Sequence, residues 1–392
     1  MNSSPVQAGI IIAPSQRASH EALADAARQL VEDASAQLHT ATGREWQFHF
    51  KEPLHLASDE RRHAGDFLGE GSLRLVEGSF DLVVILTDVA LVSRRERIVY
   101  GLVSPLARTI ILSTHRLREA ERGERLALDA PAVRYNAAAL LLHLIGHALG
   151  AKTQKPGDGA MAPFEFDPRR SSVPAFQEPS PLRRLTSVFR EREHVVNGPL
   201  GDLWLHVASA GRHLRLVGRA LARNRAPLLP LQMPGLAAAA VAPVFVLVFS
   251  AEFWDAGLGM TERTAWIYAA LSIMAATLYL CFAQRLFLPR KDSRIVPEHL
   301  AVANVVIFLS MFLAIVGLFV MVALLVLGIE LWVFPADLIS TWPTLESQQV
   351  GFSDLLRIAV FISTVGVTTG ALAGGLQRRE VLRQMALFRT EI

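Results

Sequence analysis

The chain has 392 residues, of which 51% are hydrophobic, and its formal net charge at pH 7 is only +3. So small a net charge gives no reason to expect nucleic-acid binding, and the single cysteine, Cys281, excludes both an intramolecular disulfide and a cysteine-ligated metal cluster. The hydrophobic residues are concentrated after residue 228, which indicates a membrane domain in the second half of the chain.

The first 150 residues alternate between strand-like and helix-like patterns. Short apolar runs predict strands, and longer stretches with apolar residues three and four apart predict helices. A charged loop is expected over residues 59–66. The predicted strands are 6–14, 46–50, 80–87 and 109–113, and the predicted helices are 19–40 and 130–149. This alternation predicts an α/β sandwich with a mixed sheet.

Two histidines stand four residues apart in the second of these helices. His143 and His147 therefore lie on one face of it, where both imidazoles can meet a single cation. The helix has an apolar lead-in at Ala138 to Leu142, and Gly150 is expected to end it.

Together with Gly150 and Met161, these histidines resemble the metzincin metallopeptidases, whose motif H-E-x-x-H-x-x-G-x-x-H is followed by a methionine turn. The strands before the helix look like those of archaemetzincins, so the similarity extends over roughly residues 6–180. The resemblance implies a zincin-like (metzincin-like) α/β domain, a zinc ion bound by His143 and His147, and a peptide-binding cleft.

The sequence departs from the metzincin motif at two positions. Leu144 stands where the family has its catalytic glutamate, and Thr153 stands where the third histidine ligand falls. Leucine has no titratable group and cannot take a proton from zinc-bound water, so most of the hydrolytic rate should be lost. A catalytic zinc also needs three protein ligands. The candidates for the third are Asp167, Glu165, His115 and His194, and their spacing does not select among them. The downstream cysteine ligands of archaemetzincins are absent as well.

These departures favour a membrane-anchored protein without peptidase activity, whose metzincin-like domain binds a protein or peptide in the cleft. One alternative is an active integral-membrane zinc metallopeptidase whose glutamate comes from another part of the chain. A further alternative is that His143 and His147 are two packed side chains with no metal between them. Met161 is then a core methionine beneath the helix, as it would also be in a working metzincin.

The chain divides by sequence into three parts: residues 1–180 as the metzincin-like domain, 181–227 as a basic linker, and 228–392 as the membrane domain with a short C-terminal tail. Arginines recur from Arg183 to Arg225, interleaved with leucines and valines. Gly198 and Pro199 are expected to divide this linker and leave its later part as one basic amphipathic helix. That helix would lie along an anionic membrane face, or else serve as a solvated connector.

Four long apolar segments predict four transmembrane helices, at residues 228–254, 265–286, 300–334 and 355–376. Pro243 is expected to kink the first. Basic residues flank the spans on the side of the N-terminal domain, and acidic residues dominate the two other loops. The positive-inside rule then places the N-terminal domain and the C-terminus in the cytoplasm of a multi-pass membrane protein.

Glycines recur every fourth residue in the last predicted span, at Gly366, Gly370 and Gly374. Such a ridge lets another helix approach closely. The ridge can form the interface of a homo-oligomer, and such an oligomer can be a pore or scaffold regulated by the soluble domain. Alternatively, the ridge can pack against another helix within one four-helix bundle.

Overall fold

The computed structural model describes residues 5–16, 19–56, 61–93, 96–119, 125–177, 193–195, 198–288, 295–334, 351–373 and 379–388. The chain forms two compact units. One, here the α/β unit, comprises residues 1–214, 288–305 and 383–392, and the other, the helical unit, comprises residues 215–287 and 306–382. The chain therefore leaves the α/β unit twice and returns to it twice.

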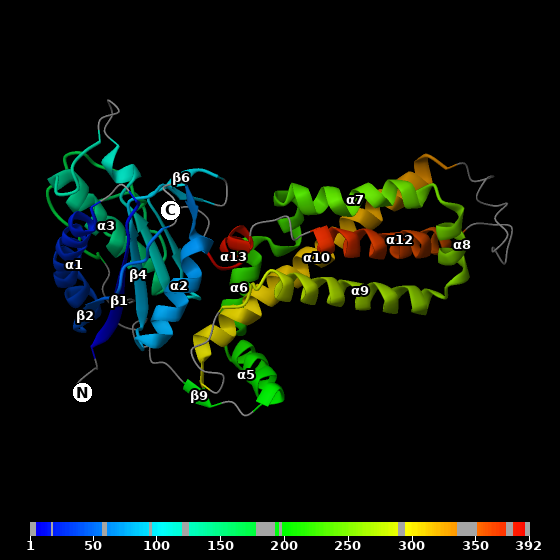
Figure 1. Ribbon diagram of the computed structural model, residues 1–392, viewed down its shortest axis with the longest axis horizontal. Coiled ribbons are helices and arrows are strands. Elements are labelled where there is room, and N and C mark those ends of the chain that lie inside the picture. The colour runs from blue at the N-terminus through cyan, green and yellow to red at the C-terminus, as the bar shows by residue number, and fades with distance from the viewer. Residues whose placement is uncertain are drawn as a thin grey trace. The chain divides into compact units, whose positions relative to one another are not determined.

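A five-stranded sheet forms the centre of the α/β unit, in the order β2-β1-β4-β8-β7 (Figure 1). The first four strands in this order are parallel, and β7 pairs antiparallel with β8 at the edge. The central strands β4 and β8 are buried along their whole length, as near-continuous apolar runs of a covered parallel sheet should be. Their bounds are β1 Val6–Ala13, β2 Trp46–Phe50, β4 Leu82–Thr87, β7 Gly101–Ser104 and β8 Thr109–Ser113. The predicted α/β fold with a mixed sheet is confirmed.

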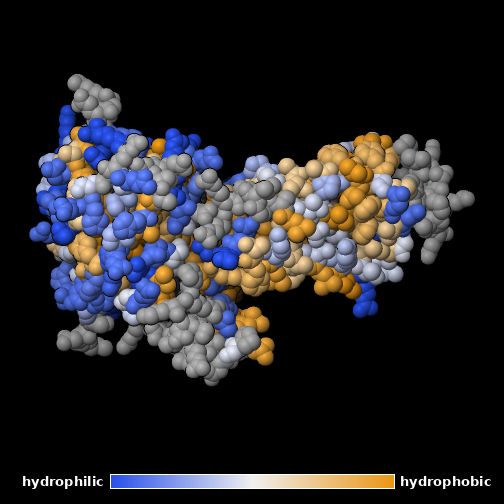
Figure 2. Space-filling view, in the orientation of Figure 1, coloured by the Kyte–Doolittle hydropathy of each residue, from blue (hydrophilic) through white to orange (hydrophobic). Residues whose placement is uncertain are grey.

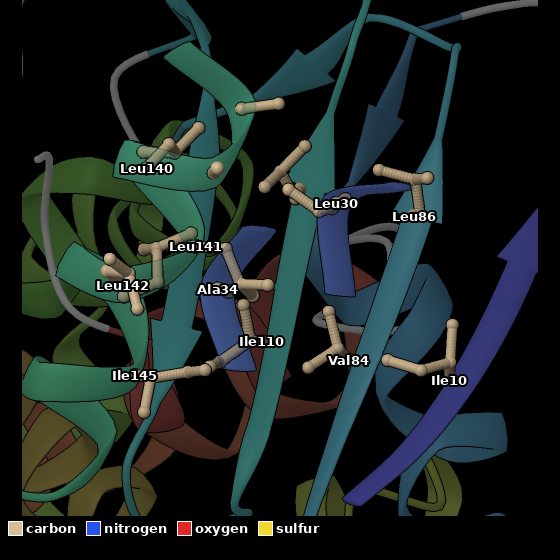
Figure 3. Close-up of a cluster of buried hydrophobic side chains, with 14 of the residues drawn as sticks. Ile10, Leu30, Ala34, Val84, Leu86, Ile110, Leu140, Leu141, Leu142 and Ile145 are labelled. Atoms are coloured by element: carbon tan, nitrogen blue, oxygen red, sulfur yellow. The ribbon is translucent and has the colours of Figure 1, made fainter. Parts of the chain in front are cut away.

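Helices cover both faces of this sheet. Helices α1 (His20–Thr42) and α3 (Pro131–Ala148) pack on one face, and their apolar side chains interlock with alternate strand residues. Figure 3 shows this cluster, with side chains from both helices pointing at Ile10, Val84 and Ile110. Helix α2 (Ala64–Glu77) covers the other face, where a Cβ at Gly71 would lie 3.3 Å from Ile85 Cδ1.

Helix α2 and a second, small sheet were not predicted from the sequence. The charged residues before Asp66 were expected to form a loop, and the three glycines within the helix weaken its pattern. Asp66 instead caps the helix, because its carboxylate accepts a hydrogen bond from the His63 backbone N–H at 2.9 Å. The small sheet has the order β3-β5-β6 and comprises β3 Arg62–His63, β5 Leu91–Val92 and β6 Ile98–Val99.

The C-terminal helix α13 (Arg379–Leu387) returns residues 383–388 to the α/β unit. The Gln384 amide is buried, accepts a hydrogen bond from the Ala64 backbone N–H at 3.2 Å and donates one to the Val92 carbonyl at 3.0 Å. Ser104 Oγ donates to the Leu387 carbonyl. Nothing in the sequence pattern predicted these contacts.

The linker forms two helices where one was predicted. Helix α5 (Gly198–Arg212) ends at His213, and α6 (Leu214–Asn224) follows. Arginines recur every four residues only from Arg215 onward, whereas α5 before it is largely apolar. The sequence predicted one helix over both stretches and did not predict the break between them. The predicted basic residues Arg183 to Arg192 lie outside the described residues.

Within the part of the chain that the structure describes, three helices are long and apolar enough to cross a membrane, or four if a bent pair counts as one span. The three are α9 (Glu262–Ala283), α10 (Glu298–Trp332, its first turns in the α/β unit) and α12 (Phe352–Ala373). Figure 2 shows hydrophobic residues over much of the helical unit's visible surface. The bent pair joins residues 214–232 to α7 (Pro234–Val248) at 55°.

A kink is predicted at Pro243, which lies inside helix α7. Helix α7 continues through Pro243, and the break falls before Pro234, which has no backbone N–H and starts the helix. The chain then forms a short helix, α8 (Ala251–Gly259), where the predicted first span was expected to continue.

The described glycines of the predicted ridge pack within one chain. A Cβ at Gly366 would lie 2.8 Å from the Ala240 carbonyl oxygen, and one at Gly370 would lie 2.8 Å from Ala240 Cβ. Helix α7 thus occupies the surface that was considered for a subunit interface. Gly374 lies outside the described residues.

Candidate functional site

The histidine helix α3 begins at Pro131 and has Leu149 as its C-terminal cap. Gly150 follows with φ of +95°, a conformation that glycine adopts without strain. This turn is closed by hydrogen bonds from the Gly150 N–H to the His147 carbonyl and from the Ala151 N–H to the Gly146 carbonyl. The glycine stop is confirmed, and the turn brings the chain after it back beside His147.

Met161 lies beneath the helix. Its Sδ atom is 2.2 Å from the position that a Cβ at Gly146 would occupy, so only glycine fits there. The Met161 carbonyl accepts a hydrogen bond from the Gln154 N–H at 2.8 Å. Met161 is expected beneath the helix both in a metal-binding site and in a packed core without metal. This contact therefore does not distinguish between those two interpretations.

The two imidazoles meet. His143 and His147 are buried, their rings are nearly perpendicular, and their Nε2 atoms are 3.0 Å apart. His143 Nδ1 lies 3.0 Å from the Ala160 carbonyl oxygen, and His147 Nδ1 lies 3.0 Å from that of Ala151. A carbonyl oxygen only accepts hydrogen bonds, so both Nδ1 atoms carry hydrogen and both Nε2 lone pairs face each other. Two facing lone pairs suit a proton or another cation shared between the two Nε2 atoms.

Thr153 also reaches this pair. Its Oγ1 lies 3.4 Å from His147 Nε2, at the position where a metzincin has its third histidine. The side chain that lies beside the imidazole here carries a neutral hydroxyl. The motif spacing identified Thr153 as the residue at the third-ligand position, but it did not predict that the Thr153 hydroxyl lies close to His147.

Leu144 faces away from the imidazoles. Its side chain is fully buried, and its Cδ1 lies 2.8 Å from where a Cβ at Gly101 would be, on edge strand β7. The position next to His143 is therefore filled by an aliphatic group packed on the sheet. Leucine fits at position 144 because the facing residue, Gly101, has no side chain.

Three of the candidates for a third ligand, His115, Asp167 and Glu165, do not join the two histidines. His115 Nε2 lies 3.1 Å from the Arg125 guanidinium, and burial and Arg125 lower the pKa of His115. The Asp167 carboxylate accepts from the Arg169 N–H at 2.9 Å, and Glu165 is exposed. His194 lies in strand β9 (Glu193–Val195), which pairs with β10 (Ile295–Pro297). Across the described ranges, no three histidine, cysteine, aspartate or glutamate residues come together as a metal site.

The donor set therefore fits a catalytic zinc ion only in part. The Nδ1–H to carbonyl contacts are the kind that orient metal-binding histidines, and the facing Nε2 atoms suit a cation. A catalytic zinc takes three protein ligands from nitrogen, sulfur or carboxylate, and only two are present here. The residues fit a shared proton or a weakly held cation.

A polar cavity of about 270 Å³ adjoins His143. The segment after Met161 supplies most of its lining, which includes Asp158, Arg169, Arg170 and Ser172. The Arg170 side chain is held by Asn136, whose amide oxygen accepts from Arg170 Nε at 3.0 Å. Charges of both signs on a supported loop suit a polar peptide segment more than an apolar ligand.

No protein-family model matches the sequence, and no curated protein is similar enough to count as a relative. Among solved structures, the archaemetzincin from Methanopyrus kandleri is similar at 18% identity and a TM-score of 0.34, over 47% of this chain and 94% of that one. A zinc-dependent peptidase from Methanocorpusculum labreanum is similar at 15% identity and a TM-score of 0.32, over 46% of this chain and 100% of the other. The archaemetzincin from Archaeoglobus fulgidus is similar at 18% identity and a TM-score of 0.27, over 46% of this chain and 98% of the other. Likenesses of this size leave the function to be argued from the chain's own residues.

Proposed function

We propose that this chain is a multi-pass membrane protein whose α/β unit does not hydrolyse peptides and instead binds a protein or peptide segment beside the histidine helix. The observation that carries the proposal is the contact of Leu144 with Gly101, because it removes the proton-transferring group and fills its place with packed aliphatic atoms. General acid–base catalysis needs a titratable group within reach of the reacting water.

The cavity beside His143 supports the binding role. It carries Asp158 and Arg169 for charged or polar side chains, and it adjoins a helix end fixed by hydrogen bonds. A peptide would be held there by hydrogen bonds and charge pairs. Zinc would act, if bound, as a structural ion between His143 and His147.

Four membrane crossings are supported by the division of the chain. Residues 215–287 and 306–382 each start and end at the α/β unit, so each segment crosses an even number of times. The first holds the bent pair and α9, and the second holds most of α10 together with α12. Basic residues near these boundaries, including Arg212, Arg285 and Arg383, support a cytoplasmic location of the α/β unit and the C-terminus.

One experiment on purified full-length protein tests the function. Hydrolysis of an unfolded protein substrate is measured with added zinc, with a chelator and in His147→Ala, and peptide binding is measured against a peptide library. We expect no zinc-dependent hydrolysis, and peptide binding that weakens in Arg169→Glu but not in the matched surface variant Arg28→Glu. Zinc-dependent hydrolysis that His147→Ala abolishes would instead establish an active membrane metallopeptidase.

The topology is tested with membrane-impermeant thiol labelling of intact cells in a Cys281→Ala background. Ala36→Cys on α1 should stay unlabelled until the cells are opened, whereas Gly259→Cys at the end of α8 should be labelled in intact cells. Labelling of Ala36→Cys in intact cells would reverse the orientation.

A further inference from the structure

Helix α5 carries an apolar face that no part of the described chain covers. Its exposed residues are Leu200, Leu203, Trp204 and Val207, with exposed fractions of 81%, 62%, 73% and 57%. The spacing i, i+3, i+4, i+7 places all four on one side of the helix. At the lower edge of Figure 2, hydrophobic atoms gather over this helix.

The opposite face of α5 is attached to the start of α10. Leu205 is buried with Ala301 in a small apolar cluster, and Arg212 pairs with Glu298 at 2.8 Å. Helix α10 has 35 residues and is therefore about 52 Å long at 1.5 Å per residue, which exceeds a whole bilayer of roughly 40–45 Å. Its first turns, where α5 is attached, must lie at or just outside the headgroup region once the apolar part of α10 spans the membrane.

The next helix along the chain supplies the charge. Arg215, Arg219 and Arg223 lie four residues apart on one side of α6, all are exposed, and within the described residues none forms an ion pair. Arginines without ion-pair partners bind anionic lipid headgroups, and an apolar face with a tryptophan inserts at the boundary between headgroups and acyl chains. Consecutive helices with these two features are typical of a membrane-surface segment.

We propose that the Leu200–Val207 face of α5 rests in the headgroup layer of the bilayer that the helical unit crosses, with the α6 arginines on anionic lipid phosphates. This inference rests on the membrane embedding proposed above. The sequence predicted contact with lipid only for the basic part of the linker, and this inference extends that contact to α5.

The test uses full-length protein in vesicles of phosphatidylcholine with phosphatidylglycerol, in a Cys281→Ala background. An environment-sensitive fluorophore is attached at Leu203→Cys, or at Val207→Cys if the first variant does not fold. Control labels are placed at Ala36→Cys on α1 and at Leu271→Cys on the exposed side of α9. Brominated lipid should quench the label at 203 and the label at 271, and should leave the label at 36 unchanged. Arg215→Gln with Arg219→Gln should reduce the quenching at 203.

The other outcomes separate the two proposals. Quenching at 271 without quenching at 203 overturns the α5 inference and leaves the embedding intact. No quenching at 271 overturns the embedding and the inference with it. A label at 203 that is shielded from an aqueous quencher but not quenched by brominated lipid means that a second copy covers the face, which also overturns the inference.

Discussion

Gln384 donates a hydrogen bond from its side-chain amide to the carbonyl oxygen of Val92 at 3.0 Å, which joins two residues 292 positions apart in the chain. The same amide accepts from the Ala64 N–H at the first turn of α2, where helix N–H groups lack partners within the helix. One buried side chain therefore satisfies two backbone groups and holds the end of the chain on the α/β unit.

Replacing Gln384 with alanine should destabilise the α/β unit. The Ala64 N–H and the Val92 carbonyl would be left buried and unpaired, at about 1–3 kcal/mol for each unsatisfied group. Thermal unfolding of the purified protein, followed by limited proteolysis between Val92 and Ser104, measures the loss. Arg28→Ala removes an exposed ion pair with Asp25 and should change the free energy of unfolding by less than about 1 kcal/mol. Equal effects of the two variants would argue against the role given to Gln384.

Alanine at Gly370 and alanine at Gly218 should have opposite effects. A Cβ at Gly370 would press on Ala240 at 2.8 Å, and such overpacking costs about 1–3 kcal/mol. Gly218 in α6 has open space around it, so alanine there should favour the helix by about 1 kcal/mol. Size-exclusion chromatography after heating in detergent reports both changes. A Gly370→Ala protein as heat-resistant as the original would show that α7 and α12 are not packed as closely as described.

Introducing a histidine at position 153 should strengthen zinc binding. Thr153 Oγ1 is already 3.4 Å from His147 Nε2, so Thr153→His would place a third imidazole near the other two and complete the ligand number of a catalytic zinc. We expect bound zinc near one per chain in Thr153→His, measured by elemental analysis after dialysis, and less in the original protein and in Thr153→Ala. Activity should still be missing unless Leu144 is also changed.

Stability should fall as the pH falls below the ordinary histidine pKa, and His115 should contribute to the fall. Burial, followed by the nearby Arg125 charge, lowers the pKa of His115 in the folded protein. The unfolded chain then binds a proton at a pH where the folded chain does not, so protonation favours unfolding. The free energy of unfolding, measured by denaturant titration from pH 8 to pH 5, should decline less steeply in His115→Gln. Identical slopes would rule out this contribution.

The sequence by itself determined the elements that depend on local pattern. Apolar runs located the strands β2 and β8 at their observed bounds, and the spacing of apolar residues located α1 and α3. The i, i+4 spacing alone was enough to place His143 and His147 on one face, because helix geometry fixes that relation. Length and hydropathy likewise located the three long apolar helices.

Only the tertiary structure decided what depends on contacts between distant residues. The burial of Leu144 against Gly101 and the bonds of Gln384 to Val92 and Ala64 join segments whose separation in sequence carries no pattern. The exposed face of α5 belongs to the same class, since it depends on which neighbours a helix meets once the chain is folded. A local pattern fixes how a segment winds, whereas packing decides which of its faces is covered.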